Sequence, residues 1–182
     1  MEHLYYLVAQ LPAISVNDDS SQKLPLTVGY FKDLCSRFMS EKSAKLAEKL
    51  TLEPPVEPVS TGSVFLDEWY EKERCLRLAL AQIRALKMKK DIKDLPSASD
   101  GESLPAARPA TGMDSPLAAE QYLNQYRLGI LDRISPLDNF SVDAVYSYGL
   151  KLMLAERMKK FNKDEGLASY HKIYDEILGE KK

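Results

Sequence analysis

Apolar residues recur at helical spacing along most of the chain, and no alternating run is long enough for a sheet. Between Leu26 and Leu50 they return every three or four positions, and the polar residues 40–43 divide this stretch into two short predicted helices. Three prolines within residues 53–58 then end any helix. The apolar cluster at residues 4–11 is too short for its period to distinguish a strand from a helix.

The strongest single helix is predicted to begin near residues 61–63, where a hydroxyl can cap the first turn, and to run to about Lys93. Acidic side chains occupy its first turns and lysines its far end, an arrangement that complements the helix dipole. Its apolar stripe consists of Leu66, Trp69, Leu76, Leu80 and Ile83.

Residues 97–114 contain four turn-forming signatures in close order, SASDG, LP, RP and TG, with almost no apolar anchor. This composition predicts a flexible linker. We therefore expect an N-terminal helical region over residues 1–96 and a second domain over residues 115–182.

Three helices are predicted in the second domain. Asp114 or Ser115 caps the first of them, with Pro116 at the first helical position. The second begins after Asn139 or Ser141 and runs to about Phe161, and the last begins at residue 162 or 164. Because the connections are short, we expect a compact antiparallel three-helix bundle. The predicted fold class is all-α, with two small bundles joined by the linker.

Composition narrows the class of protein. The chain has 182 residues, 45% hydrophobic and 29% charged, as a soluble globular protein does. Its formal net charge of −2 gives no overall attraction for nucleic acid or an anionic membrane. No apolar run approaches the ~20 residues that span a bilayer, and the start of the chain lacks the features of a signal peptide. We expect a cytoplasmic protein with Cys35 and Cys75 as reduced, buried thiols.

The candidate chemistry is sparse. His3 and His171 are the only histidines, and no nucleophile motif, phosphate loop or metal-ligand cluster accompanies them. We therefore expect no catalysis, no cofactor and no metal, while a helical enzyme with an unrecognised site stays a competing hypothesis.

Basic residues and tyrosines are the features that suggest partners. The basic residues of the 61–93 helix could form a solvated or intrahelically paired face, a protein-docking face, or a nucleic-acid patch, and we expect no nucleic-acid binding. The ten tyrosines could be core residues or part of an interface. The candidate partner-binding residues are Arg74, Arg77, Arg84, Lys87, Tyr126, Arg127, Tyr148 and Lys151.

Three blocks of sequence also carry a resemblance. They are LYYLVAQLP, WYEKERCLRLALAQIRALK, and SPLAAEQYLNQYRLGILDRI followed by NFSVDAVYSYGLKLMLAERMKKFNKDEG. In this order they are similar to a bacterial family of unknown function encoded among V-type ATPase genes. That family in turn looks like a shortened form of the V/A-type ATPase subunit called C or d.

The resemblance implies a mechanical role. In that subunit, helical bundles link the central stalk to the membrane rotor ring and so support proton or sodium transport without binding ATP. The present chain departs from it in having roughly half its usual length, so a true subunit and an assembly factor are both open. The implied partners are other V-type ATPase subunits, which would hold the protein at the inner membrane without insertion. The alternative is a helical adaptor of another cytoplasmic complex.

Overall fold

The computed structural model describes residues 4–14, 24–91, 96, 100–160 and 163–179, and this part of the chain contains helices and loops but no strand. The predicted all-α class is confirmed. The helices are α1 (Tyr5–Ala9), α2 (Val28–Phe38), α3 (Glu41–Glu48), α4 (Val64–Lys87), α5 (Ser103–Gly112), α6 (Pro116–Ile134), α7 (Val142–Lys159) and α8 (Lys163–Leu178). The open question about residues 4–11 is thus answered by a short helix.

Serine side chains set the starts of the longer helices where the sequence predicted them. The hydroxyl of Ser63 accepts a hydrogen bond from the backbone N–H of Leu66 at 3.1 Å and caps α4. Ser40, Ser115 and Ser141 cap α3, α6 and α7 in the same way. The break between α2 and α3 is therefore as predicted.

Helix α4 ends at Lys87, before the predicted end at Lys93. Lys89 adopts a left-handed conformation with φ 54°, which terminates the helix. Two backbone hydrogen bonds close this end, from Lys89 N–H to the Leu86 carbonyl at 3.0 Å and from Lys90 N–H to the Ala85 carbonyl at 2.9 Å. Residues 92–95 lie outside the described part of the chain.

Helix α5 lies inside the predicted linker and corrects that prediction for residues 103–112. Its small residues Ala106, Ala107 and Ala110 are buried in a cluster with Leu76 and Leu80 of α4. Alanine lets two helices approach closely and loses no side-chain entropy when it is buried. This packing therefore needs no large apolar residues, and their absence was what suggested a linker.

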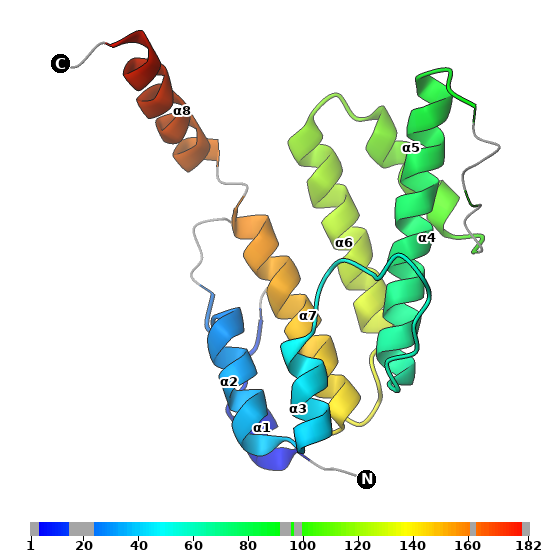
Figure 1. Ribbon diagram of the computed structural model, residues 1–182, viewed down its shortest axis with the longest axis vertical. Helices are drawn as coiled ribbons and strands as arrows, with labels where there is room; N and C mark the ends of the chain where they lie inside the picture. Colours follow the sequence, from blue (N-terminus) through cyan, green and yellow to red (C-terminus); the bar gives the residue numbers. More distant parts are fainter. Residues whose placement is uncertain (1–3, 15–23, 92–95, 97–99, 161–162, 180–182) are drawn as a thin grey trace.

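One large core connects both predicted regions. Its buried members come from α1 to α4 as well as from α6 and α7, with Trp69, Phe31, Tyr146 and Leu131 among the most buried. In Figure 1, α7 lies between the α1–α3 group and the α4–α6 group. The division into two separate bundles is not confirmed, because side chains from both sides of the predicted boundary share this core.

Helix α8 is present where predicted but does not complete a three-helix bundle. Every described side chain of α8, from residue 166 onward, is exposed, whereas α6 and α7 bury one face in the core. Figure 1 shows α8 beyond the end of α7 and apart from the other helices. The predicted caps at residues 162 and 164 lie outside the described side chains.

Both cysteines are buried, as predicted, and neither forms a disulfide. Cys35 of α2 lies in the core, and burial raises the pKa of its thiol to about 12. At neutral pH this thiol is protonated and acts as a small apolar side chain.

Candidate functional site

A buried ion pair joins α4 to α6 and contains one of the predicted partner-binding residues. Glu73 and Arg127 are only 1% and 5% exposed. Arg127 donates from Nε to Glu73 Oε2 at 2.9 Å and from Nη2 to Glu73 Oε1 at 3.0 Å, a two-pronged contact. Arg127 was expected at a docking surface, and the structure places it in the interior instead.

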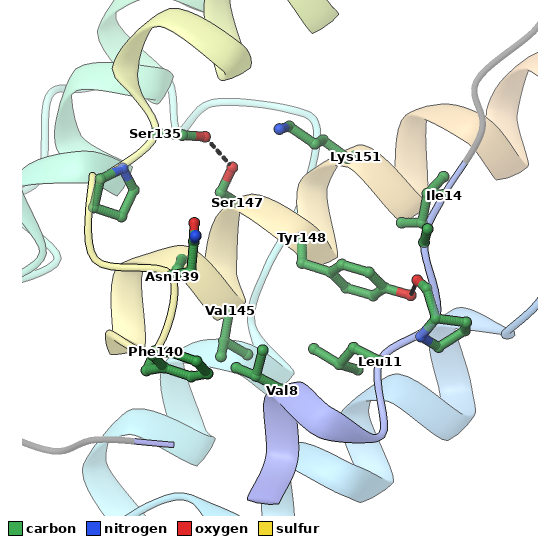
Figure 2. A pocket seen from close by; sticks show the side chains of 14 residues that line it. Val8, Leu11, Ile14, Ser135, Asn139, Phe140, Val145, Ser147, Tyr148 and Lys151 are labelled. Carbon is green, nitrogen blue, oxygen red and sulfur yellow. Dashed lines mark hydrogen bonds between the residues drawn. The ribbon is translucent and has the colours of Figure 1, made fainter. Parts of the chain in front are cut away.

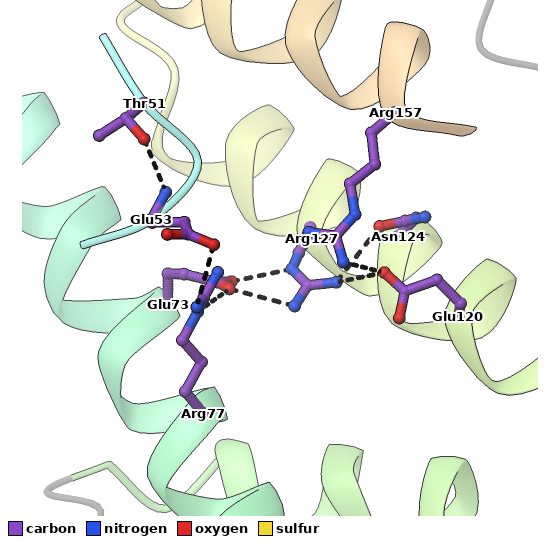
Figure 3. A network of polar contacts seen from close by, with 8 residues as sticks. All are labelled: Thr51, Glu53, Glu73, Arg77, Glu120, Asn124, Arg127 and Arg157. Atoms are coloured by element: carbon purple, nitrogen blue, oxygen red, sulfur yellow. Dashed lines mark hydrogen bonds and ion pairs between the residues drawn. The ribbon is translucent and has the colours of Figure 1, made fainter. Parts of the chain in front are cut away.

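Charged neighbours extend this pair to the surface, as Figure 3 shows. Arg77 donates to Glu73 Oε1 at 2.8 Å, and Arg127 donates to Asn124 Oδ1 at 3.2 Å. Glu120 lies 3.7 Å from Arg127 Nη1 and also binds Arg157 of α7. The network therefore connects three helices, and its form suits the fixing of their relative positions better than the binding of a partner.

The other basic candidates on α4 lie in three different environments. Arg74 pairs with Glu71 and donates to the Pro55 carbonyl, so it is used within the chain. Lys87 binds the Thr111 carbonyl at the end of α5. Arg84 is exposed and has no ion pair with any described residue, so it is the α4 candidate best placed to meet a partner.

Tyr148 and Lys151 of α7 line an apolar pocket of about 690 Å³ beside α1. The Tyr148 hydroxyl donates a hydrogen bond to the Pro12 carbonyl at 2.8 Å. Figure 2 shows the Tyr148 ring between Lys151 and Leu11. Burial raises the pKa of Tyr148 to about 12. Lys151 is paired with Asp132 at 2.6 Å. Two of the predicted residues thus meet at one concave site, both already bonded within the chain.

Tyr126 lies at the junction of α4, α5 and α6, where it packs against both buried clusters. Its hydroxyl is buried beside the hydroxyl of Ser103 of α5. Burial raises the pKa of Tyr126, and the carboxylates of Asp100 and Glu102 raise it further. This environment is that of a core tyrosine and not of an interface tyrosine, the two alternatives that the sequence left open.

Among the described helices, α8 carries the greatest number of exposed large apolar side chains. We call its six residues the α8 face: Leu167, Tyr170, Ile173, Tyr174, Ile177 and Leu178. Their exposed fractions lie between 49% and 77%, and the rings of Tyr170 and Tyr174 stack with centroids 5.9 Å apart. Single exposed apolar residues are ordinary, but a contiguous set of this size marks an interaction site.

The sequence predicted the amphipathic pattern of α8 but not its exposure. The same spacing of apolar residues serves a helix that packs in its own core and one that packs on a partner. Only the position of α8, away from α6 and α7, separates the two possibilities. Its residues were therefore absent from the predicted site.

No described helix is both long and apolar enough to cross a membrane. Among the described residues, no three His, Cys, Asp or Glu side chains are grouped so that they could hold a metal ion.

Comparison with known proteins gives one match. Residues 110–181 match the sequence profile of a family described as "Protein of unknown function (DUF2764)". The matched range extends from the end of α5 through α6, α7 and α8. No curated protein and no solved structure matches the chain.

Proposed function

We propose that this protein is a non-catalytic docking component of a larger assembly, and that the assembly is a V-type rotary ATPase in which it serves as a subunit or assembly factor of the C/d kind. The observation that supports a docking role is the α8 face, six large apolar side chains left exposed on one helix. Each loses an unfavourable contact with water when a partner covers it, about 1–2 kcal/mol for a half-exposed aliphatic or aromatic side chain.

The choice of a rotary ATPase has a different support. It rests on the ordered resemblance of the three sequence blocks and on an all-α architecture compatible with the helical subunit that links stalk and rotor ring. The internal ion network suits a mechanical part, because a two-pronged buried pair and its neighbours fix α4, α6 and α7 against one another. In this proposal the body of the protein is a rigid platform and α8 is its attachment point.

Affinity purification of the full chain from the native cell tests the proposal. We expect stalk or rotor-ring subunits of the ATPase to co-purify with the tagged protein. Ile173→Asp should reduce their yield at least tenfold, because it places a charge in the α8 face that a partner must desolvate. The matched control is Ala168→Asp, which adds the same charge at an exposed position about 140° around α8 from Ile173, outside the α8 face, and should leave the yield unchanged.

Other outcomes contradict the proposal in distinct ways. If the wild-type protein never brings down ATPase subunits, the rotary ATPase assignment is wrong. If it does so and Ile173→Asp behaves like Ala168→Asp, docking occurs elsewhere on the molecule. Helicity of both variants should match that of the wild type, since exposed substitutions usually change stability by less than about 0.5 kcal/mol.

A further inference from the structure

The end of α4 carries a local concentration of positive charge. Residues 84–91, which we call the α4 tip, read RALKMKKD, with four basic side chains and one carboxylate. All four basic residues are exposed, and so is Arg108 on the neighbouring helix α5. A hydrogen bond from Lys87 to the Thr111 carbonyl holds the ends of α4 and α5 together, so Arg108 adds its charge to the same region.

The backbone of the α4 tip has a fixed shape. Lys89, in its left-handed conformation, turns the chain, and the N–H groups of Lys89 and Lys90 bond to carbonyls of the last helical turn. Arg84, Lys89 and Lys90 form no ion pair with any residue that the structure describes. Their charges are therefore available to a ligand outside the chain.

The charge of the α4 tip is opposite to that of the rest of the molecule. The whole chain has a formal net charge of −2, so the residues outside the positive tip are negative in sum. An anionic surface repels most of the molecule and attracts this end of it. Figure 1 shows the end of α4 pointing away from the α1–α3 group, so such a contact has a defined orientation.

Two apolar side chains stand among these lysines. Leu86 and Met88 are 58% and 59% exposed. Cations near the C-terminus of a helix complement its dipole, but this effect does not account for the exposed apolar residues between them. The interface of an anionic bilayer covers both kinds of side chain, because ammonium groups reach the phosphates while apolar groups enter the boundary with the acyl chains.

An acidic protein surface matches the α4 tip less well. A specific protein interface uses about 20–30 residues on each side, whereas the tip is a single turn of eight residues. Arginine is the side chain suited to two-pronged contacts with carboxylates, yet the tip has one arginine and three lysines. Carboxylates alone would also leave Leu86 and Met88 in water.

We infer that the α4 tip binds the surface of a membrane that contains anionic phospholipids. The ammonium groups of Lys87, Lys89 and Lys90 lie at the lipid phosphates, and Leu86 and Met88 lie in the interfacial layer. The contact is peripheral and reversible, since each basic residue near an anionic bilayer increases affinity only about fivefold. This inference goes beyond the docking role proposed above and does not depend on it, because the ligand is the lipid itself.

Co-sedimentation of the purified full-length protein with vesicles tests the inference. We expect binding to phosphatidylglycerol vesicles at least tenfold tighter than to phosphatidylcholine vesicles, and loss of this difference in high salt. The double variant Lys89→Gln with Lys90→Gln should weaken binding to phosphatidylglycerol about 25-fold. The matched control, Lys42→Gln with Lys49→Gln, removes two exposed charges at α3 and should change binding less than twofold.

A variant that keeps every charge separates lipid from other anionic ligands. Met88→Gln should weaken binding to phosphatidylglycerol at least threefold, because the apolar contact is lost. Binding of wild type to poly-glutamate should be much weaker than to the vesicles. If poly-glutamate binds as tightly and Met88→Gln has no effect, the ligand is an acidic polypeptide surface and the inference is wrong.

Two further results would overturn the inference. One is equal binding of wild type to the two lipids, and the other is an equal loss in the two double variants. The apolar α8 face meets both lipids alike, so only the difference between the lipids counts. Lipid binding without co-purification of ATPase subunits leaves the α4 tip assignment in place and removes the rotary ATPase. Co-purification without selective lipid binding removes only the α4 tip assignment.

Discussion

At the scale of single residues, Gly149 shows how closely the helices of the core approach. It lies on α7 under the ring of Phe31, a fully buried side chain of α2. A Cβ added at Gly149 would lie 2.6 Å from Cε1 of Phe31 and 3.0 Å from Cδ1 of Leu50. Helix α7 therefore needs a residue without a side chain at this position.

The expected result of Gly149→Ala is a loss of about 1–3 kcal/mol in the free energy of unfolding, because the Phe31 ring must move within a packed core. The better helix propensity of alanine offsets part of this loss. The control is Gly129→Ala on α6, where an added Cβ meets nothing within 4 Å and should stabilise the protein by about 0.5–1 kcal/mol. Urea unfolding followed by circular dichroism measures the free energy of unfolding of both variants. Equal stabilisation by the two substitutions would show that the core has room for a methyl group at Gly149.

At the scale of helices, the pair Glu73–Arg127 determines how α4 and α6 meet. Glu73→Ala should cost about 3–5 kcal/mol, because it leaves the guanidinium of Arg127 buried without its partner. Replacing both residues with methionine should cost far less, since neither of the two buried charges then remains, and their neighbours Arg77 and Glu120 are partly exposed. Chemical unfolding of the single and double variants separates the cost of leaving one buried charge unpaired from the net contribution of the pair to stability.

An exposed pair provides the comparison. Glu41 and Lys45 are 2.6 Å apart on α3, and both are in water. Glu41→Ala should change the free energy of unfolding by about 0.5 kcal/mol or less. If Glu73→Ala is no more costly than Glu41→Ala, water reaches Arg127 when its partner is removed, and the network is not a rigid connection.

How far the helices could be predicted depended on the kind of signal that each one carries. Capping serines and large apolar residues are visible in a sequence, so α2, α3, α4, α6 and α7 were found close to their true starts. Helix α5 was missed because two prolines, Pro105 and Pro109, suggest a loop and because alanine burial leaves no apolar period. The end of α4 was misplaced because Lys89 occupies a left-handed position where glycine is usual.

The candidate site was harder to predict for a related reason. Arginine is usually exposed, so sequence placed Arg127 at the surface, and only the approach of Glu73 from α4 reveals its burial. Conversely, the apolar residues of α8 are usually core residues. The long-range contacts of Arg127 and of the apolar residues of α8 depend on the assembled fold, so the local sequence around each could not reveal them.

At the scale of the whole molecule, the body should be stable without its last helix. Removal of residues 161–182 should change the free energy of unfolding by less than about 1 kcal/mol, because the described side chains of α8 bury little surface. Thermal melts of the full and shortened chains test this. A loss of several kcal/mol would mean that α8 packs on the body in solution, and the proposed attachment point would then be part of the core.

Helix α4 takes part in both buried clusters. Its first half supplies Trp69 and Tyr70 to the large core, and its second half supplies Leu76 and Leu80 to the cluster with α5. Tyr126 touches both. Neither cluster can melt alone without exposing apolar surface of a helix that the other cluster needs intact. We therefore expect the body from α1 to α7 to unfold cooperatively, as one thermodynamic unit with a single transition.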